Sequence, residues 1–131
     1  ASKRGWLHRK GAAPTDNGLV LIPGSRGSLS YIVKPIGDQQ ENAWSLAHGA
    51  GRKWNRADCR QRFRKPGSAQ ALKQTALGSC VICEDKNLLL EEAPEAYKDI
   101  EIVIQDMLEW GVIEVVASLR PMITYKTRRS K

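Results

Sequence analysis

One amphipathic segment near the C-terminal end constrains the fold of this chain more than any other feature. Between residues 94 and 110, apolar side chains recur with helical spacing, at Ile100, Val103, Ile104, Met107 and Leu108. That spacing places them along one face of an α-helix, which then needs a core to cover it. Pro94 suits the first turn of such a helix, and Gly111 suits its C-terminal end. We therefore predict a helix from Pro94 to Trp110 that packs into the core.

The remaining segments predict short strands and short helices in a mixed order. Apolar or alternating runs predict extended structure at 19–22, 30–33, 80–83, 87–90, 112–117 and 122–125. Helical patterns are weaker and predict short helices at 42–46, 56–63 and 69–77. Polar residues and breakers fill residues 1–18, which we expect to be a loop. Because strands and helices do not alternate in a regular βαβ order, the pattern favours the α+β class.

The positive charge of the chain is concentrated in its first half. The 131 residues are 41% hydrophobic, enough for a single domain with a core, and they carry a net charge of +7. Residues 1–65 contain 13 Lys and Arg against 4 Asp and Glu, whereas residues 66–131 contain 8 against 10. A basic half favours an anionic partner such as nucleic acid or nucleotide phosphates. A merely solvated basic surface is the alternative.

The small number of cysteines and the lack of long apolar runs indicate where in the cell the protein is expected. Cys59, Cys80 and Cys83 are too few for a disulfide framework in a chain of this length, so a reduced, cytoplasmic setting is expected. Cys80 and Cys83 have CxxC spacing, but a strand would point them to opposite faces. We therefore expect buried core cysteines and assign no metal ligand. No apolar run approaches the roughly 20 residues that span a bilayer, so no membrane partner is expected.

The stretch IPGSRGSLSY, residues 22–31, combines two glycines, three serines and Arg26 between two predicted strands. Glycines let backbone N–H groups approach a phosphate, and serine hydroxyls and an arginine add donors. The stretch lacks the Gly-Lys-Ser/Thr ending of a P-loop. A phosphate-binding loop and an ordinary Gly/Ser turn are both compatible with it.

Two basic clusters each contain one of the only two histidines. His48 precedes Gly49, Ala50, Gly51 and Arg52. A neutral imidazole can attack phosphorus, small neighbours would leave room for a nucleotide, and Arg52 could hold phosphoryl charge. The other cluster, HRKGA at 8–12, could use Arg9 and Lys10 to contact RNA phosphates. A histidine in a glycine-rich turn and a solvated basic loop are the respective alternatives.

Together these motifs resemble the C-terminal part of one family, the RtcB-type RNA-splicing ligases. The resemblance runs over nearly the whole chain and is carried in order by HRKGA (8–12), IPGSRGSLSY (22–31), HGAGR (48–52), EEAPEAYKDI (91–100) and LRPM…YK (119–126). It implies the C-terminal portion of a larger catalytic domain. It also implies an enzyme that joins RNA 3′-phosphate or 2′,3′-cyclic phosphate ends to 5′-hydroxyl ends, with GTP and Mn²⁺.

The resemblance also implies a role for individual residues. His48 would be the residue that becomes guanylylated. The implied nucleotide contacts are Pro23, Gly24, Ser25, Arg26, Ser30, Gly49, Ala50, Gly51, Tyr97 and Lys126. On this interpretation residues 1–65 form a basic part that contacts nucleotide and RNA, residues 66–126 form an α+β core part, and residues 127–131 form a basic tail.

Some features depart from the family pattern. The family loop more often has Met at the position of Arg26. The family's metal ligands, an Asp, a Cys and several His, belong to an upstream region that this sequence does not contain, and His8 and the CxxC do not replace them. We therefore expect the chain alone to be inactive, to expose a surface that the upstream part of the same enzyme would cover, and to need that part as a partner. A non-catalytic RNA- or nucleotide-binding relative or remnant is the alternative.

Overall fold

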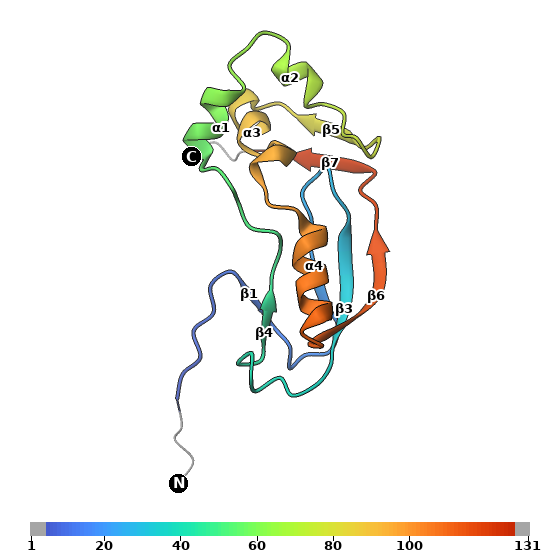
Figure 1. Ribbon diagram of the computed structural model, residues 1–131. Helices are drawn as coiled ribbons and strands as arrows, with labels where there is room; N and C mark the ends of the chain where they lie inside the picture. The colour runs from blue at the N-terminus through green and yellow to red at the C-terminus, as the bar shows by residue number, and fades with distance from the viewer. Residues whose placement is uncertain (1–4, 128–131) are drawn as a thin grey trace.

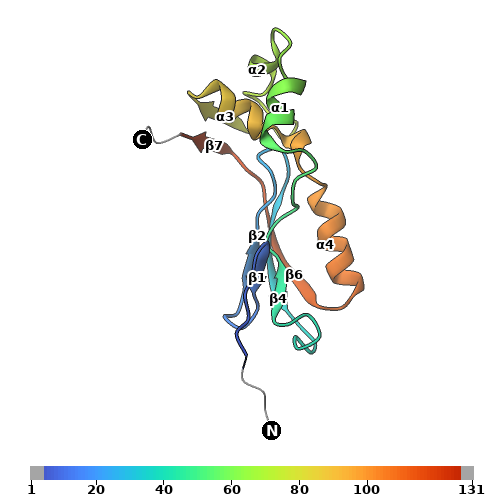
Figure 2. The same cartoon turned by 90° about the vertical axis from the view of Figure 1, so that its left-hand side faces the viewer.

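A three-stranded antiparallel sheet with one helix on its face forms the larger part of the molecule. The computed structural model describes residues 5–127. The strand order is β2 (Val20–Ile22), β3 (Ser30–Pro35) and β6 (Ile113–Leu119). Helix α4 (Ile100–Glu109) lies along one face of this sheet (Figures 1 and 2). The presence of both helices and separate antiparallel and parallel strand pairs confirms the α+β class.

Alternation along the strands and the stripe on α4 build the main core. Tyr31 and Val33 are buried on the helix-facing side of β3. Ile100, Ile104 and Met107 are buried from the helix side and belong to the same apolar cluster. This confirms that the predicted stripe packs in the core, although Leu108 at its margin is 39% exposed.

The predicted helix from Pro94 to Trp110 is wrong in its first six residues. Pro94–Ala96 form a separate 3₁₀ turn, η1, and Tyr97 is extended. The helix begins only after Asp99, whose carboxylate accepts a hydrogen bond from the Glu101 N–H. A capping carboxylate satisfies a backbone donor that the first helical turn leaves free, and this fixes the start of α4.

A smaller unit lies at one end of the sheet (Figure 1). It contains helices α1 (Arg56–Arg62), α2 (Ser68–Ala71) and α3 (Lys86–Glu91). Strand β5 (Cys80–Cys83) pairs in parallel with β7 (Ile123–Lys126) beside them. Their apolar cluster consists of Leu72, Val81, Leu89, Leu90 and Ala93.

Two further expectations about local structure are wrong. Residues 87–90 are helical in α3 rather than extended, because Asp85 accepts from the Leu88 N–H and Leu89 and Leu90 are buried together. Residues 42–46 do not form a helix, since Ala43 and Trp44 have φ values of 52° and 49°. These left-handed values cannot continue a right-handed helix.

The turn at Ala43 and Trp44 leads into a strand pair that the sequence patterns did not indicate. Strand β4 (Ser45–Ala47) pairs with β1 (Ala12–Pro14), which lies inside the predicted N-terminal loop. The predicted helices near 56–63 and 69–77 correspond to α1 and to the shorter α2. The structure therefore anchors HGAGR, which follows β4, through a strand that local propensity does not reveal.

The cysteines are free, and they differ in burial. Cys59 is fully buried, as expected, whereas Cys80 is exposed and Cys83 is intermediate. The expectation of a buried thiol is therefore wrong for Cys80. The reason is the alternation of β5, where Val81 points into the core and its neighbours on both sides do not.

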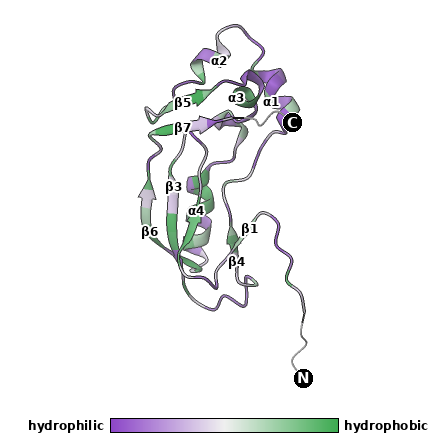
Figure 3. Ribbon diagram, turned by 180° about the vertical axis from the view of Figure 1, so that it is seen from behind, coloured by the Kyte–Doolittle hydropathy of each residue, from purple (hydrophilic) through white to green (hydrophobic). Residues whose placement is uncertain are grey.

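The sheet face away from α4 carries exposed apolar side chains. Leu21, Ile32 and Ala117 are partners across the three strands, and Leu21 is 55% exposed. Figure 3 views this face and shows apolar stretches on β3 and β6. That a longer protein covers this sheet face stays a prediction.

Within residues 5–127, no helix has the length and apolar character that crossing a membrane requires. The predicted basic tail beyond Thr127 lies outside the described residues.

Candidate nucleotide-binding site

Six of the residues predicted to contact a nucleotide line a single cavity. The cavity has a volume of about 300 Å³, and the six are Gly24, Ser25, Arg26, Ser30, Tyr97 and Lys126. They come from the loop between β2 and β3 and the first residue of β3, from the segment after η1, and from β7. Three segments that lie far apart in the sequence thus meet at one hollow. The volume is in the range of small-ligand pockets, which is about 300 to 1,000 Å³.

The loop between β2 and β3 is held by its own serines. The Gly24 N–H donates to Ser30 Oγ at 3.0 Å, and the Ser25 N–H donates to Ser28 Oγ at 2.8 Å. A Cβ atom at position 24 would overlap the Leu29 carbonyl oxygen and come within 2.8 Å of Ser28 Oγ. The close approach of the two sides of the loop therefore requires glycine there.

The side chain of Arg26, which belongs to the same loop, is buried, and only part of its guanidinium is hydrogen-bonded. Arg26 is only 8% exposed, and its Nη2 donates to the Leu89 carbonyl oxygen at 3.0 Å. Nε and Nη1 have no hydrogen-bond partner among the described residues. Burial lowers the pKa of the guanidinium from its ordinary value. Arg26 belongs to the cavity lining, and a buried cation with unsatisfied nitrogen atoms favours a nearby anionic group such as a phosphate.

Tyr97 is tied into a charged network at the other side of the cavity. Its hydroxyl donates to Glu92 Oε2 at 2.5 Å and accepts from Arg52 Nη1 at 2.9 Å. The Arg52 guanidinium carbon also lies 4.8 Å from the centroid of the Tyr97 ring. Burial, reinforced by the bond to Glu92, raises the pKa of Tyr97 to about 12. The phenol is therefore a fixed, protonated wall of the cavity at neutral pH.

Glu92 lines the cavity, although the sequence analysis did not predict it as a site residue. It lines the hollow, accepts from Tyr97, and its Oε2 lies 4.0 Å from Lys126 Nζ. Its position within the family motif EEAPEAYKDI was the sequence feature that could have identified it. Pro121 and Thr124 also line the cavity and were not predicted.

Arg52 is engaged within the protein. Nη2 donates to the Glu91 carbonyl oxygen at 2.6 Å, Nε donates to the Trp54 carbonyl oxygen at 3.0 Å, and Nη1 reaches Glu92 as well as Tyr97. In this arrangement Arg52 holds the Tyr97 ring in place. Its assignment as a phosphate contact stays a prediction.

His48 lies next to this loop but does not line the cavity. Its side chain is exposed, and its backbone N–H donates to the Gly11 carbonyl oxygen at 3.4 Å. A Cβ atom at Gly49 would lie 3.1 Å from the Pro23 carbonyl oxygen, so this segment abuts the start of the nucleotide loop.

The residues after Gly49 connect this segment to the core and to the Tyr97 segment. Ala50 is buried in the main core, and Gly51 has a φ of +76° that favours glycine. The Lys98 N–H donates to the Gly51 carbonyl oxygen at 3.0 Å. HGAGR thus contacts both the Pro23 side and the Tyr97 side of the site.

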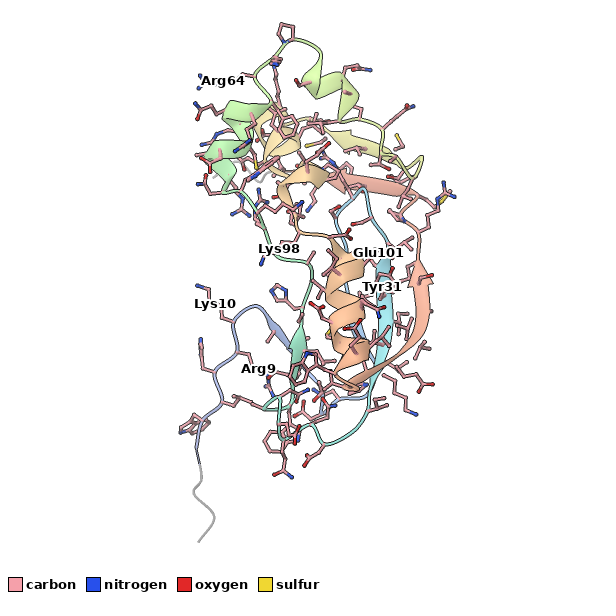
Figure 4. All side chains as sticks on the ribbon, viewed as in Figure 1. Arg9, Lys10, Tyr31, Arg64, Lys98 and Glu101 are labelled. Atoms are coloured by element: carbon pink, nitrogen blue, oxygen red, sulfur yellow. The ribbon has the colours of Figure 1, made fainter. Side chains whose placement is uncertain are left out.

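The first basic cluster lies beside β4. Arg9 Nε donates to Ser45 Oγ at 2.9 Å, and its Nη2 donates to the Trp44 carbonyl oxygen at 3.1 Å. Lys10 is exposed. Figure 4 shows Lys10 and Lys98 directed to the same side of the molecule. Neither Arg9 nor Lys10 lines the cavity, and their contact with RNA stays a prediction.

The described residues do not provide a metal centre of their own. No group of three or more His, Cys, Asp and Glu side chains in residues 5–127 is arranged to hold a metal ion. The donor set therefore does not fit the Mn²⁺ that the resemblance implies.

Comparison with known proteins identifies the family of the chain. A family model described as tRNA-splicing ligase RtcB matches residues 1–127. The chain is 54% identical over 129 residues to the RNA-splicing ligase RtcB2 of Escherichia coli, covering 98% of this chain and 34% of that protein. It is 38% identical over 104 residues to the tRNA-splicing ligase RtcB of Methanopyrus kandleri, covering 79% of this chain and 10% of that protein.

A third relative extends the same pattern. The tRNA-splicing ligase RtcB of Nanoarchaeum equitans is 36% identical over 108 residues, which cover 82% of this chain and 22% of that protein. The chain thus spans between 10% and 34% of the length of these curated relatives. With the family model matching nearly every residue, the chain belongs to the tRNA-splicing ligase RtcB family.

Proposed function

We propose that this chain is the guanylate-accepting part of a GTP-dependent RNA ligase. The enzyme would join an RNA 3′-phosphate or 2′,3′-cyclic phosphate end to a 5′-hydroxyl end, with RNA ends and GTP as its partners. The observation that carries the proposal is the cavity. Residues from three separate motifs, among them Gly24, Arg26, Tyr97 and Lys126, line one hollow. The buried guanidinium of Arg26 has two nitrogen atoms that no other described residue pairs with.

The cavity residues suit the parts of a guanine nucleotide. Arg26 supplies a positive charge beside the cavity for phosphate oxygens, and the requirement for glycine at position 24 keeps the backbone close to the ligand. The Tyr97 ring forms an apolar wall for the base, and Lys126 supplies a donor at the edge. Glu92 holds both of these side chains in position.

The chemistry of the proposed reaction begins at His48. A neutral imidazole nitrogen attacks the α-phosphorus of GTP, the N–P bond forms, and pyrophosphate leaves as its P–O bond breaks. The displaced imidazole proton passes to solvent. An oxygen of the RNA 3′-phosphate then takes the GMP from His48, which breaks the N–P bond. Finally the 5′-hydroxyl attacks the RNA phosphorus, loses its proton to solvent and displaces GMP, and the new phosphodiester remains.

Metal ions would neutralise the phosphates in such a transfer. Because the described residues do not fit a metal, we place the Mn²⁺ ligands in the region of the longer relatives that this chain does not span. The chain alone would then bind a nucleotide without completing ligation. The upstream part of the enzyme would be its partner, and the location would be cytoplasmic.

The position of His48 favours a second candidate function, reversible nucleotide binding without catalysis. His48 does not line the cavity, so a nucleotide held there would need to extend past the Pro23–Gly49 contact to reach it. A non-catalytic, nucleotide-binding relative of the family would need no such reach. It would bind GTP reversibly and form no covalent product.

Equilibrium binding of GTP to the 131-residue chain tests the cavity. Calorimetric titration should give saturable binding that weakens about tenfold or more in Lys126→Ala, since a hydrogen bond to a charged group contributes about 1.5–3 kcal/mol. Lys34→Ala is the matched control, because Lys34 is an exposed lysine on β3 outside the cavity. Equal binding by both variants would show that the cavity is not the GTP site.

A further inference from the structure

A second, strongly basic groove lies at the other side of the smaller unit. It is bounded by α1, the connection from α1 to α2, and α3, and it has a volume of about 630 Å³. No residue is shared with the cavity described above, and no Asp or Glu lines the groove. The cations in its lining are Arg60, Arg64, Lys65 and Lys86.

Most of the other cations near this groove are already used by the protein. Arg60 Nη1 lies 2.5 Å from Glu91 Oε1, and Arg56 lies 3.8 Å from carboxylate oxygens of both Glu91 and Glu92. The Arg62 guanidinium lies 4.4 Å from the Trp54 ring centroid. The ion pairs of Arg56 and Arg60 fasten α1 onto the end of α3, and the Arg62 contact fixes Trp54 beside α1.

Three cations of the groove lining remain without such contacts. Arg64, Lys65 and Lys86 are exposed, and none of them forms an ion pair within the described part of the chain. In Figure 4 the Arg64 side chain projects outward from the end of the molecule that holds α1, and Figure 3 shows that α1 is predominantly hydrophilic. Among the described residues, the groove therefore presents positive charge without an ion-pair partner from two segments, the connection between α1 and α2 and the start of α3.

The floor of the groove is apolar and partly aromatic. Phe63, the residue that ends α1, is half-buried there, and its ring centroid lies 6.4 Å from that of Trp54. Pro66, Ala69 and Leu90 also contribute apolar lining. Cations around an aromatic floor are the combination with which proteins bind single-stranded nucleic acid, because phosphates pair with the cations and a base stacks on the ring.

We propose that this groove binds single-stranded RNA away from the reacting ends. Arg64, Lys65 and Lys86 contact successive phosphates, and the face of one base lies on Phe63. The inference rests on the proposed function for its choice of RNA as the polyanion. It adds a binding surface that is separate from the nucleotide cavity and from His48. The groove would hold the body of the substrate strand while its end is joined.

A pair of charge-matched double variants tests the groove. Lys65→Ala/Lys86→Ala removes two groove cations, and Lys34→Ala/Lys73→Ala removes two exposed lysines that do not line it. Binding of a single-stranded RNA with hydroxyl groups at both ends is measured by fluorescence anisotropy at several salt concentrations, without GTP or Mn²⁺. Circular dichroism checks folding, and the Gln versions of both variants repeat the measurement.

The groove variant should bind RNA about tenfold more weakly near 0.15 M salt, and the slope of log K against log salt should become shallower by about 1.4. These values follow from about 0.7 counterions released for each single-strand phosphate contact. The control should bind like the unmodified chain. An abasic oligonucleotide of equal length should bind more weakly than RNA, since base stacking on an aromatic ring contributes to affinity.

Equal RNA binding by the two double variants would overturn the inference. If, in addition, only the groove variant lost binding to poly-glutamate, the groove would serve an acidic protein in place of RNA. Failure of the ligase proposal is distinguishable, because the RNA has no ends that can be joined and GTP is absent. A chain that never accepts GMP but loses RNA binding on Lys65→Ala/Lys86→Ala would still support the groove.

Discussion

The Tyr97 hydroxyl donates a 2.5 Å hydrogen bond to Glu92 Oε2, and both side chains line the same cavity. This bond joins the segment before α4 to the end of α3, five residues earlier in the chain. Glu92 also lies close to Arg52 and Lys126, so it connects the smaller unit to the nucleotide-binding residues. The stability of this corner of the molecule should therefore depend on the protonation of Tyr97.

The pKa of Tyr97 predicts a loss of stability at alkaline pH. In the folded chain its pKa is about 12, against 10 for the ordinary phenol. A pKa raised on folding stabilises the folded state fully below pH 10, and this contribution is lost as the pH rises from 10 through 12. The free energy of unfolding, measured by urea titration, should fall more steeply over this range in the unmodified chain than in Tyr97→Phe.

Tyr125→Phe is the control for that comparison, because Tyr125 is 67% exposed. At pH 7, Tyr97→Phe should lower the free energy of unfolding by about 1–3 kcal/mol, since it removes the hydrogen bond that the part-buried Oε2 of Glu92 accepts. Tyr125→Phe should change it by less than about 0.5 kcal/mol. Parallel pH curves for the unmodified chain and Tyr97→Phe would contradict the assigned bond.

Gly24→Ala should disturb the nucleotide loop. The added methyl group would overlap the Leu29 carbonyl oxygen, which belongs to the backbone and cannot rotate away. We expect a loss of about 1–3 kcal/mol in the free energy of unfolding, as for other overpacked sites, and loss of GTP binding. Gly5→Ala is the control, because nothing lies within 4 Å of a Cβ atom there. Unchanged GTP affinity in Gly24→Ala would show that the ligand does not depend on this close approach.

Arg26→Met should separate binding from stability. The buried guanidinium has one hydrogen bond to Leu89, and two of its nitrogen atoms have no partner within residues 5–127. An apolar side chain of similar length should therefore leave the free energy of unfolding within about 1 kcal/mol or raise it. GTP affinity should fall about tenfold or more, because a charge-assisted contact with a phosphate is lost. A strongly destabilised variant with unchanged GTP affinity would assign Arg26 a purely structural role.

The sequence predicted those parts of the fold that local patterns encode. The strand at 30–33 and the helical spacing of Ile100, Ile104 and Met107 depend on nearest-neighbour geometry, and both were confirmed. The left-handed Trp44 and the β1–β4 pair depend on contacts more than 30 residues apart, so no local pattern indicated them.

In the candidate site, too, sequence motifs identified some residues, whereas others are recognisable only from contacts in the folded chain. The residues of the nucleotide loop and Lys126 were identified through family motifs, and composition alone left an ordinary turn equally acceptable. Glu92 was missed because its importance arises from bonds to Tyr97 and Lys126, which only the folded chain brings together. The structural use of Arg52 likewise depends on its contacts with Glu91 and Tyr97.

The most direct test is the intact mass of a chimaera after incubation with GTP and Mn²⁺. In the chimaera this chain replaces the matching third of the Escherichia coli relative, which restores the region that the chain does not span. His48→Ala and His8→Ala are matched variants, because these are the only two histidines in the chain. Our account predicts one acid-labile GMP on the unmodified chimaera and on His8→Ala, and none on His48→Ala. A GMP adduct that persists in His48→Ala, or its absence from the unmodified chimaera while the intact relative forms one, would contradict it.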